Sequence, residues 1–158
     1  IITPGVDIKK YPVCYASHAA VDGINSIVKS EKIKINDVKK IVCGVPPIIE
    51  SNLTYNDPKN AKEAQFSIQF AIAMIIKFGS IKLEHLNNEY IFDTSIQILM
   101  KKIFMNVEKL PKKINFEDNI CPEWSNVQLY TNDGNYFEKF DFLFRKDKKS
   151  LRKSNDLG

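Results

Sequence analysis

Arginine is almost absent from this sequence. Of the 23 basic residues only Arg145 and Arg152 are arginines, although the net charge is +4. Proteins that read nucleic-acid bases favour arginine, because its guanidinium group makes paired hydrogen bonds to base edges. The lysine excess therefore favours a solvated surface or attraction of small anions, and we expect no nucleic-acid partner. The alternative, a basic nucleic-acid-binding module, rests only on residues 145–153, and such a charge run is typical of a solvated, disordered tail.

Cysteine and histidine are also scarce. The three cysteines, Cys14, Cys43 and Cys121, are too few and too scattered for a disulfide framework or a zinc site. The sequence has neither a glycine-rich phosphate loop nor a paired-histidine metal motif. No apolar run approaches the roughly 20 residues that a helix needs to span a bilayer. We therefore expect no bound metal, no membrane partner and a reduced, cytoplasmic setting.

The length of 158 residues suits one domain with a hydrophobic core. Residues 1–5 are typical of a linker rather than of a signal peptide. We divide the chain into a linker over residues 1–10, a domain over residues 11–145 and a basic, disordered tail over residues 146–158.

Apolar periodicity and capping residues predict three main helices. The first spans residues 17–30 with Ser17 as its cap. The second spans residues 57–78, because Asp57-Pro58 is a helix start and Gly79 a natural stop. The third follows Asp93 as far as residue 100. His85, among polar neighbours, is expected to be exposed.

Alternating apolar residues predict strands over residues 38–45 and 103–107. A hairpin follows over residues 124–144, and its Asp133-Gly134 turn suits type I′ geometry. Strands clustered with helices, without regular alternation, predict an α+β fold. We expect a two-layer sandwich in which a mostly antiparallel sheet of about four strands packs against helices.

The stretch over residues 9–22 carries the candidate chemistry. Pro12 favours extended geometry at Tyr11, and Ser17 as a cap would place His18 in the first helical turn. A helix N-terminus offers free N–H groups and positive potential, which suit a carboxylate. Lys9 is a cation, and His18 can act as base or acid near neutral pH. The plain alternative is a helix start with surface lysines and a half-buried histidine.

Two motifs in this sequence resemble a known family. Residues 9–22 read K-x-Y-P-x-C-x-x-x-H-x-x-x-D, and residues 64–73 are similar to A-x-F-S-x-x-Y-x-x-A. Together they resemble the smaller, C-terminal domain of MmgE/PrpD proteins, over about residues 7–145. That family includes 2-methylcitrate dehydratase, cis-aconitate decarboxylase and iminodisuccinate epimerase.

The resemblance implies a lid domain that closes over the site of a cofactor-independent lyase or isomerase acting on small di- or tricarboxylic acids. 2-Methylcitrate dehydration is the leading case. It also implies an N-terminal helical domain of the same protein, to which residues 1–10 would be the linker, and a homodimer. The isolated chain is then expected to be inactive. The alternative is a non-catalytic dimerisation or interaction domain on the same scaffold.

The resemblance also assigns candidate residues. Lys9 and His18 match the motif lysine and histidine and are the expected catalytic residues. The residues themselves add three expected substrate-binding residues: Tyr11, whose phenol could donate a hydrogen bond, and Ser67 and Gln69, which either face a cleft or are buried with hydrogen-bond partners. Phe70 departs from the family pattern, since some members carry a tyrosine there, and this puts transfer of one exact reaction in doubt.

Overall fold

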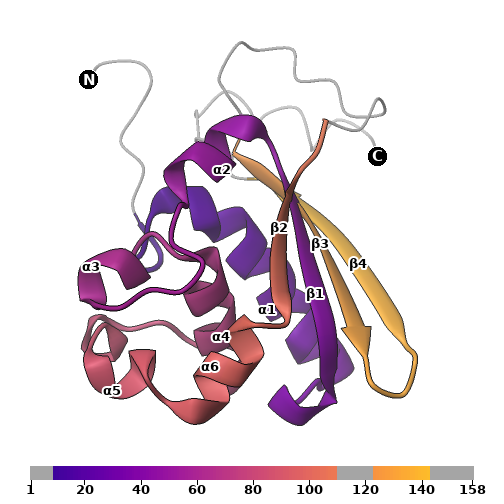
Figure 1. Ribbon diagram of the computed structural model, residues 1–158. Helices are drawn as coiled ribbons and strands as arrows, with labels where there is room; N and C mark the ends of the chain where they lie inside the picture. The colour runs from indigo at the N-terminus through magenta and orange to yellow at the C-terminus, as the bar shows by residue number, and fades with distance from the viewer. Residues whose placement is uncertain (1–8, 110–122, 143–158) are drawn as a thin grey trace, which may run out of the picture.

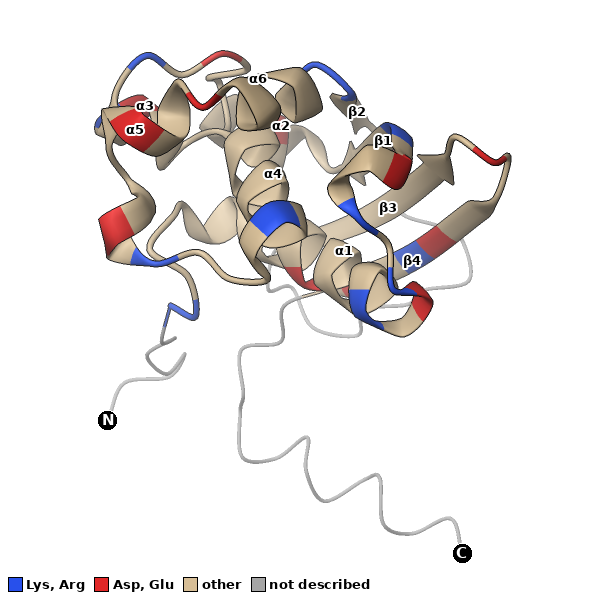
Figure 2. Ribbon diagram, turned by 90° about the horizontal axis from the view of Figure 1, so that it is seen from below, with Lys and Arg blue, Asp and Glu red and all other residues tan. Residues whose placement is uncertain are grey.

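The computed structural model describes residues 9–109 and 123–142, in which a four-stranded sheet is covered by helices on one face (Figures 1 and 2). The strands are β1 (Val38–Val45), β2 (Ile103–Val107), β3 (Trp124–Thr131) and β4 (Tyr136–Phe142), in the order β2-β1-β3-β4. β1 pairs antiparallel with β3, and β3 antiparallel with β4, whereas β1 and β2 are parallel. The predicted α+β fold with a mostly antiparallel sheet is confirmed.

The helices between β1 and β2 supply the crossover that a parallel strand pair requires. They are α2 (Pro47–Asn52), α3 (Ala61–Ala64), α4 (Ile68–Phe78), α5 (Asn88–Ile91) and α6 (Thr94–Met100). Before β1 comes α1 (His18–Glu31), preceded by the short 3-10 turn η1 (Tyr15–Ser17). Two more such turns are η2 (Ile35–Asp37) and η3 (Leu83–His85).

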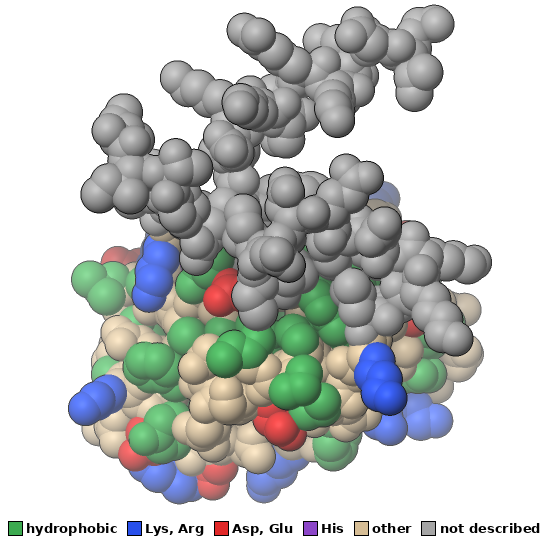
Figure 3. All heavy atoms as spheres, turned by 90° about the horizontal axis from the view of Figure 1, so that it is seen from above, with side chains coloured by type: hydrophobic (Ala, Val, Ile, Leu, Met, Phe, Trp, Pro, Cys, Tyr) green, Lys and Arg blue, Asp and Glu red, His purple; other side chains and the backbone are tan. Residues whose placement is uncertain are grey.

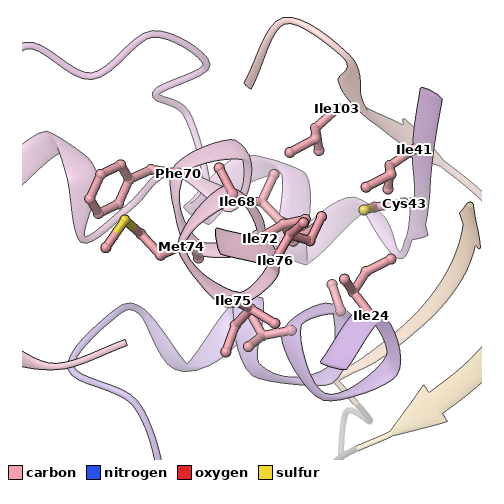
Figure 4. Close-up of a cluster of buried hydrophobic side chains, with 14 of the residues drawn as sticks. Ile24, Ile41, Cys43, Ile68, Phe70, Ile72, Met74, Ile75, Ile76 and Ile103 are labelled. Carbon is pink, nitrogen blue, oxygen red and sulfur yellow. The ribbon is translucent and has the colours of Figure 1, made fainter. Parts of the chain in front are cut away.

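The core is built around α4, whose residues 68–76 are all buried. Nearly all residues of such a helix are apolar because neighbouring elements cover it on every side; α1, α6 and β2 all contact α4. Figure 4 shows Ile72 and Ile76 pointing toward β1, whereas Phe70 and Met74 point the opposite way. α1 packs against α4 and against β3 and β4. Gly23 makes this contact close, since a Cβ there would lie 2.8 Å from Val127 Cγ2.

The helix predicted over residues 57–78 is wrong in its first half. Asp57 and Pro58 precede the helical residues, and the segment is divided into α3 and α4. The Asn60 side chain caps α3 by accepting from the Glu63 N–H, and the Ser67 hydroxyl caps α4 by accepting from the Phe70 N–H. Short polar side chains that bond the backbone in this way begin new helices rather than continue one. Gly79 does end α4, as predicted.

The hairpin is confirmed, but its turn is not type I′. That type needs positive φ at both central residues, and Gly134, with φ of 92°, is the position of positive φ in this loop. The Gly134 N–H donates to Thr131 O, and the Thr131 N–H donates to Asn135 O. This is a type I turn followed by a glycine bulge, a three-residue alternative that also matches strand twist.

His85 is buried rather than exposed. Its Nδ1 accepts a hydrogen bond from the Lys82 N–H at 3.2 Å, and its ring packs against those of Phe78 and Tyr90, with centroid distances of 5.3 and 4.9 Å. The predictions for linker residues 1–8, for Cys121 and for the tail after residue 142 lie outside the described residues.

Candidate functional site

The segment from residue 9 to η1 lies over the beginning of α1. The Cys14 N–H donates to Gln65 O at 2.7 Å, which ties this segment to the turn between α3 and α4. Ser17 occupies the N-cap position, but its hydroxyl donates to Cys14 O and caps nothing. The backbone N–H of Ser17 bonds Cys14 O and that of His18 bonds Tyr15 O. Two of the N–H groups at this helix N-terminus, those of Ser17 and His18, are therefore already bonded within the chain.

His18 is the most unusual polar group of this region. Its side chain is 2% exposed and lies between two tyrosines, with centroid distances of 5.2 Å to Tyr11 and 5.0 Å to Tyr15. Its Nε2 is buried and has no hydrogen-bond partner among the described residues. Buried polar nitrogens usually have a partner, so one without is a candidate for function.

The electrostatic setting keeps this imidazole neutral. Burial lowers the pKa of His18 below its ordinary value of 6.5, and the Lys9 charge acts in the same direction. Hydrogen bonding to the backbone of Val13 and the charge of Asp22 oppose the shift without reversing it. A neutral imidazole with an unpartnered nitrogen has the properties of a general base.

His18 also makes stability depend on pH. Because the folded chain binds this proton less readily than the unfolded chain, the contribution of His18 to the free energy of unfolding is fully present above about pH 6.5 and is lost as pH drops toward the folded-state pKa. We expect the wild-type chain to lose more stability between about pH 7 and about pH 5 than a His18→Gln variant. Urea unfolding across this range measures both slopes, and equal slopes would contradict the assignment.

Tyr11 is held by a carboxylate rather than pointing freely to solvent. Its hydroxyl donates to Asp22 Oδ1 at 2.7 Å, and Lys10 Nζ donates to the same oxygen at 2.5 Å. Burial, followed by the bond to Asp22, raises the pKa of Tyr11. Because its proton is committed to Asp22, the Tyr11 oxygen is left as an acceptor. A role for Tyr11 in substrate binding stays a prediction.

The two adjacent lysines differ in what they contact. Lys10 forms the ion pair with Asp22. Lys9 is exposed, and no carboxylate of the described ranges lies within ion-pairing distance of its ammonium group. The Lys9 charge lowers the pKa of His18, so this lysine is near enough to the imidazole to act on it. Of the two lysines, Lys9 is therefore the one that stays available to bind an anion beside His18.

Ser67 and Gln69 are both buried, at 1% and 4% exposed. The Ser67 hydroxyl accepts from the Phe70 N–H at 3.1 Å, so it serves first as a helix cap. Gln69 Nε2 donates to Asn56 Oδ1 at 3.1 Å, whereas its Oε1 is buried without a described partner. Gln69 lines a cavity of about 530 Å³ beside β2, and that lining includes neither Lys9 nor His18. Contact of Ser67 and Gln69 with substrate stays a prediction.

The role of Asp22 as the shared partner of Lys10 and Tyr11 was not predicted from the sequence. Asp22 lies four residues after His18 on α1, where side chains share a helix face, and this spacing was the available signal. The cavity beside β2 had no local signal, because it joins residues of α2, α4, α6 and β2.

No helix in the described ranges is long and apolar enough to cross a membrane. The same residues contain no group of three or more potential ligands that could hold a metal ion.

Comparison with known proteins agrees with the two motifs. The model of the MmgE/PrpD C-terminal domain matches residues 11–141, which is most of the chain. A search of curated proteins finds no match.

Proposed function

Because the chain belongs to the MmgE/PrpD family, as the match to its C-terminal domain shows, we propose that it is the lid of a cofactor-independent lyase or isomerase for small di- or tricarboxylic acids. The reaction proposed first is dehydration of 2-methylcitrate; epimerisation and decarboxylation are close alternatives. The proposal includes a helical domain of the same protein, a homodimer and a cytoplasmic location.

The observation that carries the proposal is the pair of Lys9 and His18. Removing a proton next to a carboxylate builds negative charge, so the reaction needs a base at the carbon and a cation at the carboxylate. His18 offers a neutral, unpartnered Nε2, and Lys9 offers an ammonium group without a described partner. We propose that Lys9 holds a substrate carboxylate and that His18 transfers the proton.

One observation favours the non-catalytic alternative, a dimerisation or interaction domain. His18 is 2% exposed beneath Tyr11 and Tyr15, so substrate reaches Nε2 only if the segment over residues 9–15 shifts. In the lid proposal this shift accompanies closure on the helical domain. In the alternative it never occurs.

Proton NMR in D2O tests the proposal. The 158-residue chain alone, and the same chain joined to a helical domain of the family, are incubated with 2-methylcitrate, citrate and cis-aconitate. We expect loss of a C–H signal, a new alkene or loss of CO2 in the joined protein alone. Turnover by the chain alone would overturn the lid role, and no reaction by a folded joined protein would favour the interaction domain.

A further inference from the structure

The segment that precedes α1 closes His18 off from solvent. The imidazole is 2% exposed, and the rings of Tyr11 and Tyr15 pack against it. Figure 3, which views the molecule from the side of α2, shows no histidine among the described side chains in view, in agreement with this burial. Since the His18 Nε2 atom has no partner among the described residues, it can meet a substrate only after the segment moves. What holds the segment in place therefore decides when His18 can act.

One carboxylate holds two neighbouring residues of this segment. The Tyr11 hydroxyl donates to Asp22 Oδ1 at 2.7 Å, and Lys10 Nζ donates to the same oxygen at 2.5 Å. Lys10 Nζ also lies 5.1 Å from the centroid of the Tyr11 ring. Hydrogen bonds to a charged group are stronger than those between neutral groups, and these two bonds share one acceptor. Asp22 therefore ties Lys10 and Tyr11 to α1 as a unit.

Asp22 lies beside His18 on α1. The two residues are four positions apart, a spacing that brings side chains to the same face of a helix. Residues 9–14, by contrast, belong to neither a helix nor a strand. The Asp22 contacts therefore fix an irregular segment to a regular helix, next to the imidazole. They hold the Tyr11 ring where it packs on His18, with a centroid distance of 5.2 Å.

The segment has a second anchor that does not involve Asp22. The Cys14 N–H donates to Gln65 O at 2.7 Å, and the Val13 side chain is 2% exposed in the core. Loss of the Asp22 contacts therefore frees residues 10 and 11 while Cys14 stays in place. Such an opening is local, and a local opening costs less free energy than unfolding of the whole domain.

The Asp22 carboxylate also acts on His18 through its charge. Burial lowers the pKa of His18, whereas the Asp22 charge raises it and the Lys9 charge lowers it further. Solvent and salt screen charges that lie far apart, so an effect of this kind indicates a short distance. Asp22 is therefore near enough to the imidazole to influence it directly as well as through Tyr11.

We propose that Asp22 is a positioning residue for His18: it holds Lys10 and Tyr11 over the imidazole, and their release opens Nε2. The Asp22 side chain is 24% exposed, so water can replace the two donors when they leave and no unpaired charge is buried. The proposal rests on the proposed function in taking His18 as the group that transfers the proton. Its own claim concerns access to His18, and its test needs no turnover.

Reaction of the two histidines with diethyl pyrocarbonate measures this access in the 158-residue chain at about pH 7.5, where imidazole is mostly neutral. Mass spectrometry of tryptic peptides reports His18 and His85 separately. When opening is fast, the rate follows the fraction of open molecules. We expect Asp22→Ala and Tyr11→Phe each to raise the His18 rate about tenfold, because each removes a hydrogen bond to a charged group. The double variant should react about as fast as Asp22→Ala, because both changes remove the same bond.

The His85 rate is the internal control, and it should not change in any of these variants. Asp57→Ala is the matched control variant, because it removes an exposed carboxylate that pairs with Lys59 and with no residue of the segment. It should leave the His18 rate unchanged. Tyr11→Phe removes a single oxygen atom, so it decides the matter if Asp22→Ala does not fold.

An unchanged His18 rate in Tyr11→Phe would overturn the proposal. So would a rise that His85 shares, since that would mean a general loosening of the fold, or a double variant about tenfold faster than either single variant. A joined protein without turnover would contradict the proposed reaction and leave these rates as they are. Failure of the positioning role and failure of the proposed function are therefore distinguishable.

Discussion

A His18→Gln variant of the joined, active protein should lose at least about 100-fold in kcat/KM, the effect typical of removing a general acid or base. The reason is the state of the ring: burial keeps it neutral, and its Nε2 has no described partner in the folded chain. Glutamine keeps a polar side chain of similar reach but has no group that titrates near neutral pH. Initial rates with the carboxylic acid found by NMR, together with their pH profile, measure the effect.

The controls come from the same chain. His85 is the second buried histidine, but its Nδ1 accepts from the Lys82 backbone, so His85→Gln should lower stability and leave kcat unchanged. Lys9→Ala should weaken substrate binding, whereas Lys10→Ala should not, because Lys10 is paired with Asp22. Equal activity in the two histidine variants would leave His18 as a structural residue of the helix start.

Sequence periodicity was sufficient for the sheet because each strand has an apolar face. Ile41, Cys43 and Val45 alternate toward the core, and β1 and β2 have the bounds that their patterns predict. The single helix predicted over residues 57–78 was wrong for a local reason. The side chains of Asn60 and Ser67 accept hydrogen bonds from backbone N–H groups three residues later, and the spacing of apolar residues does not indicate such bonds. The prediction that His85 is exposed was wrong for a similar reason. Its polar neighbours in the sequence do not indicate that the rings of Phe78 and Tyr90 pack against it in the fold.

Only the part of the candidate site that comes from one short segment of the sequence could be predicted. Lys9, Tyr11 and His18 come together because one short segment folds onto the helix that follows it. Gln69 belongs to a contact between distant segments, with Asn56 and the cavity beside β2, and no spacing in the sequence implies that partner. The position of β2 at the end of the sheet is equally non-local, since it depends on which strands pair.

Phe70→Ala should remove about 3–5 kcal/mol from the free energy of unfolding, the cost of an empty space where a buried aromatic ring was. Phe70 is fully buried in the first turn of α4, the helix around which the core is built. Total stabilities are about 5–15 kcal/mol, so this one change takes a large share. Urea unfolding of the 158-residue chain measures it.

Phe92→Ala is the matched control, because that phenylalanine is 51% exposed. It should cost less than about 1 kcal/mol. Similar losses in the two variants would contradict the placement of Phe70 in the core.

A Phe70→Tyr variant tests whether the space next to the Phe70 ring is closed and apolar or is open to water or a polar group. Some family members carry a tyrosine at this position, and a hydroxyl buried without a partner costs about 1–3 kcal/mol. We expect a loss in this range, because the Phe70 side chain is 0% exposed. A Phe70→Tyr variant as stable as the wild type would mean that the new hydroxyl reaches water or a polar partner. Position 70 would then border a cleft. The replacement of the tyrosine of some family members by Phe70 would then change the candidate site rather than only the packing of the core.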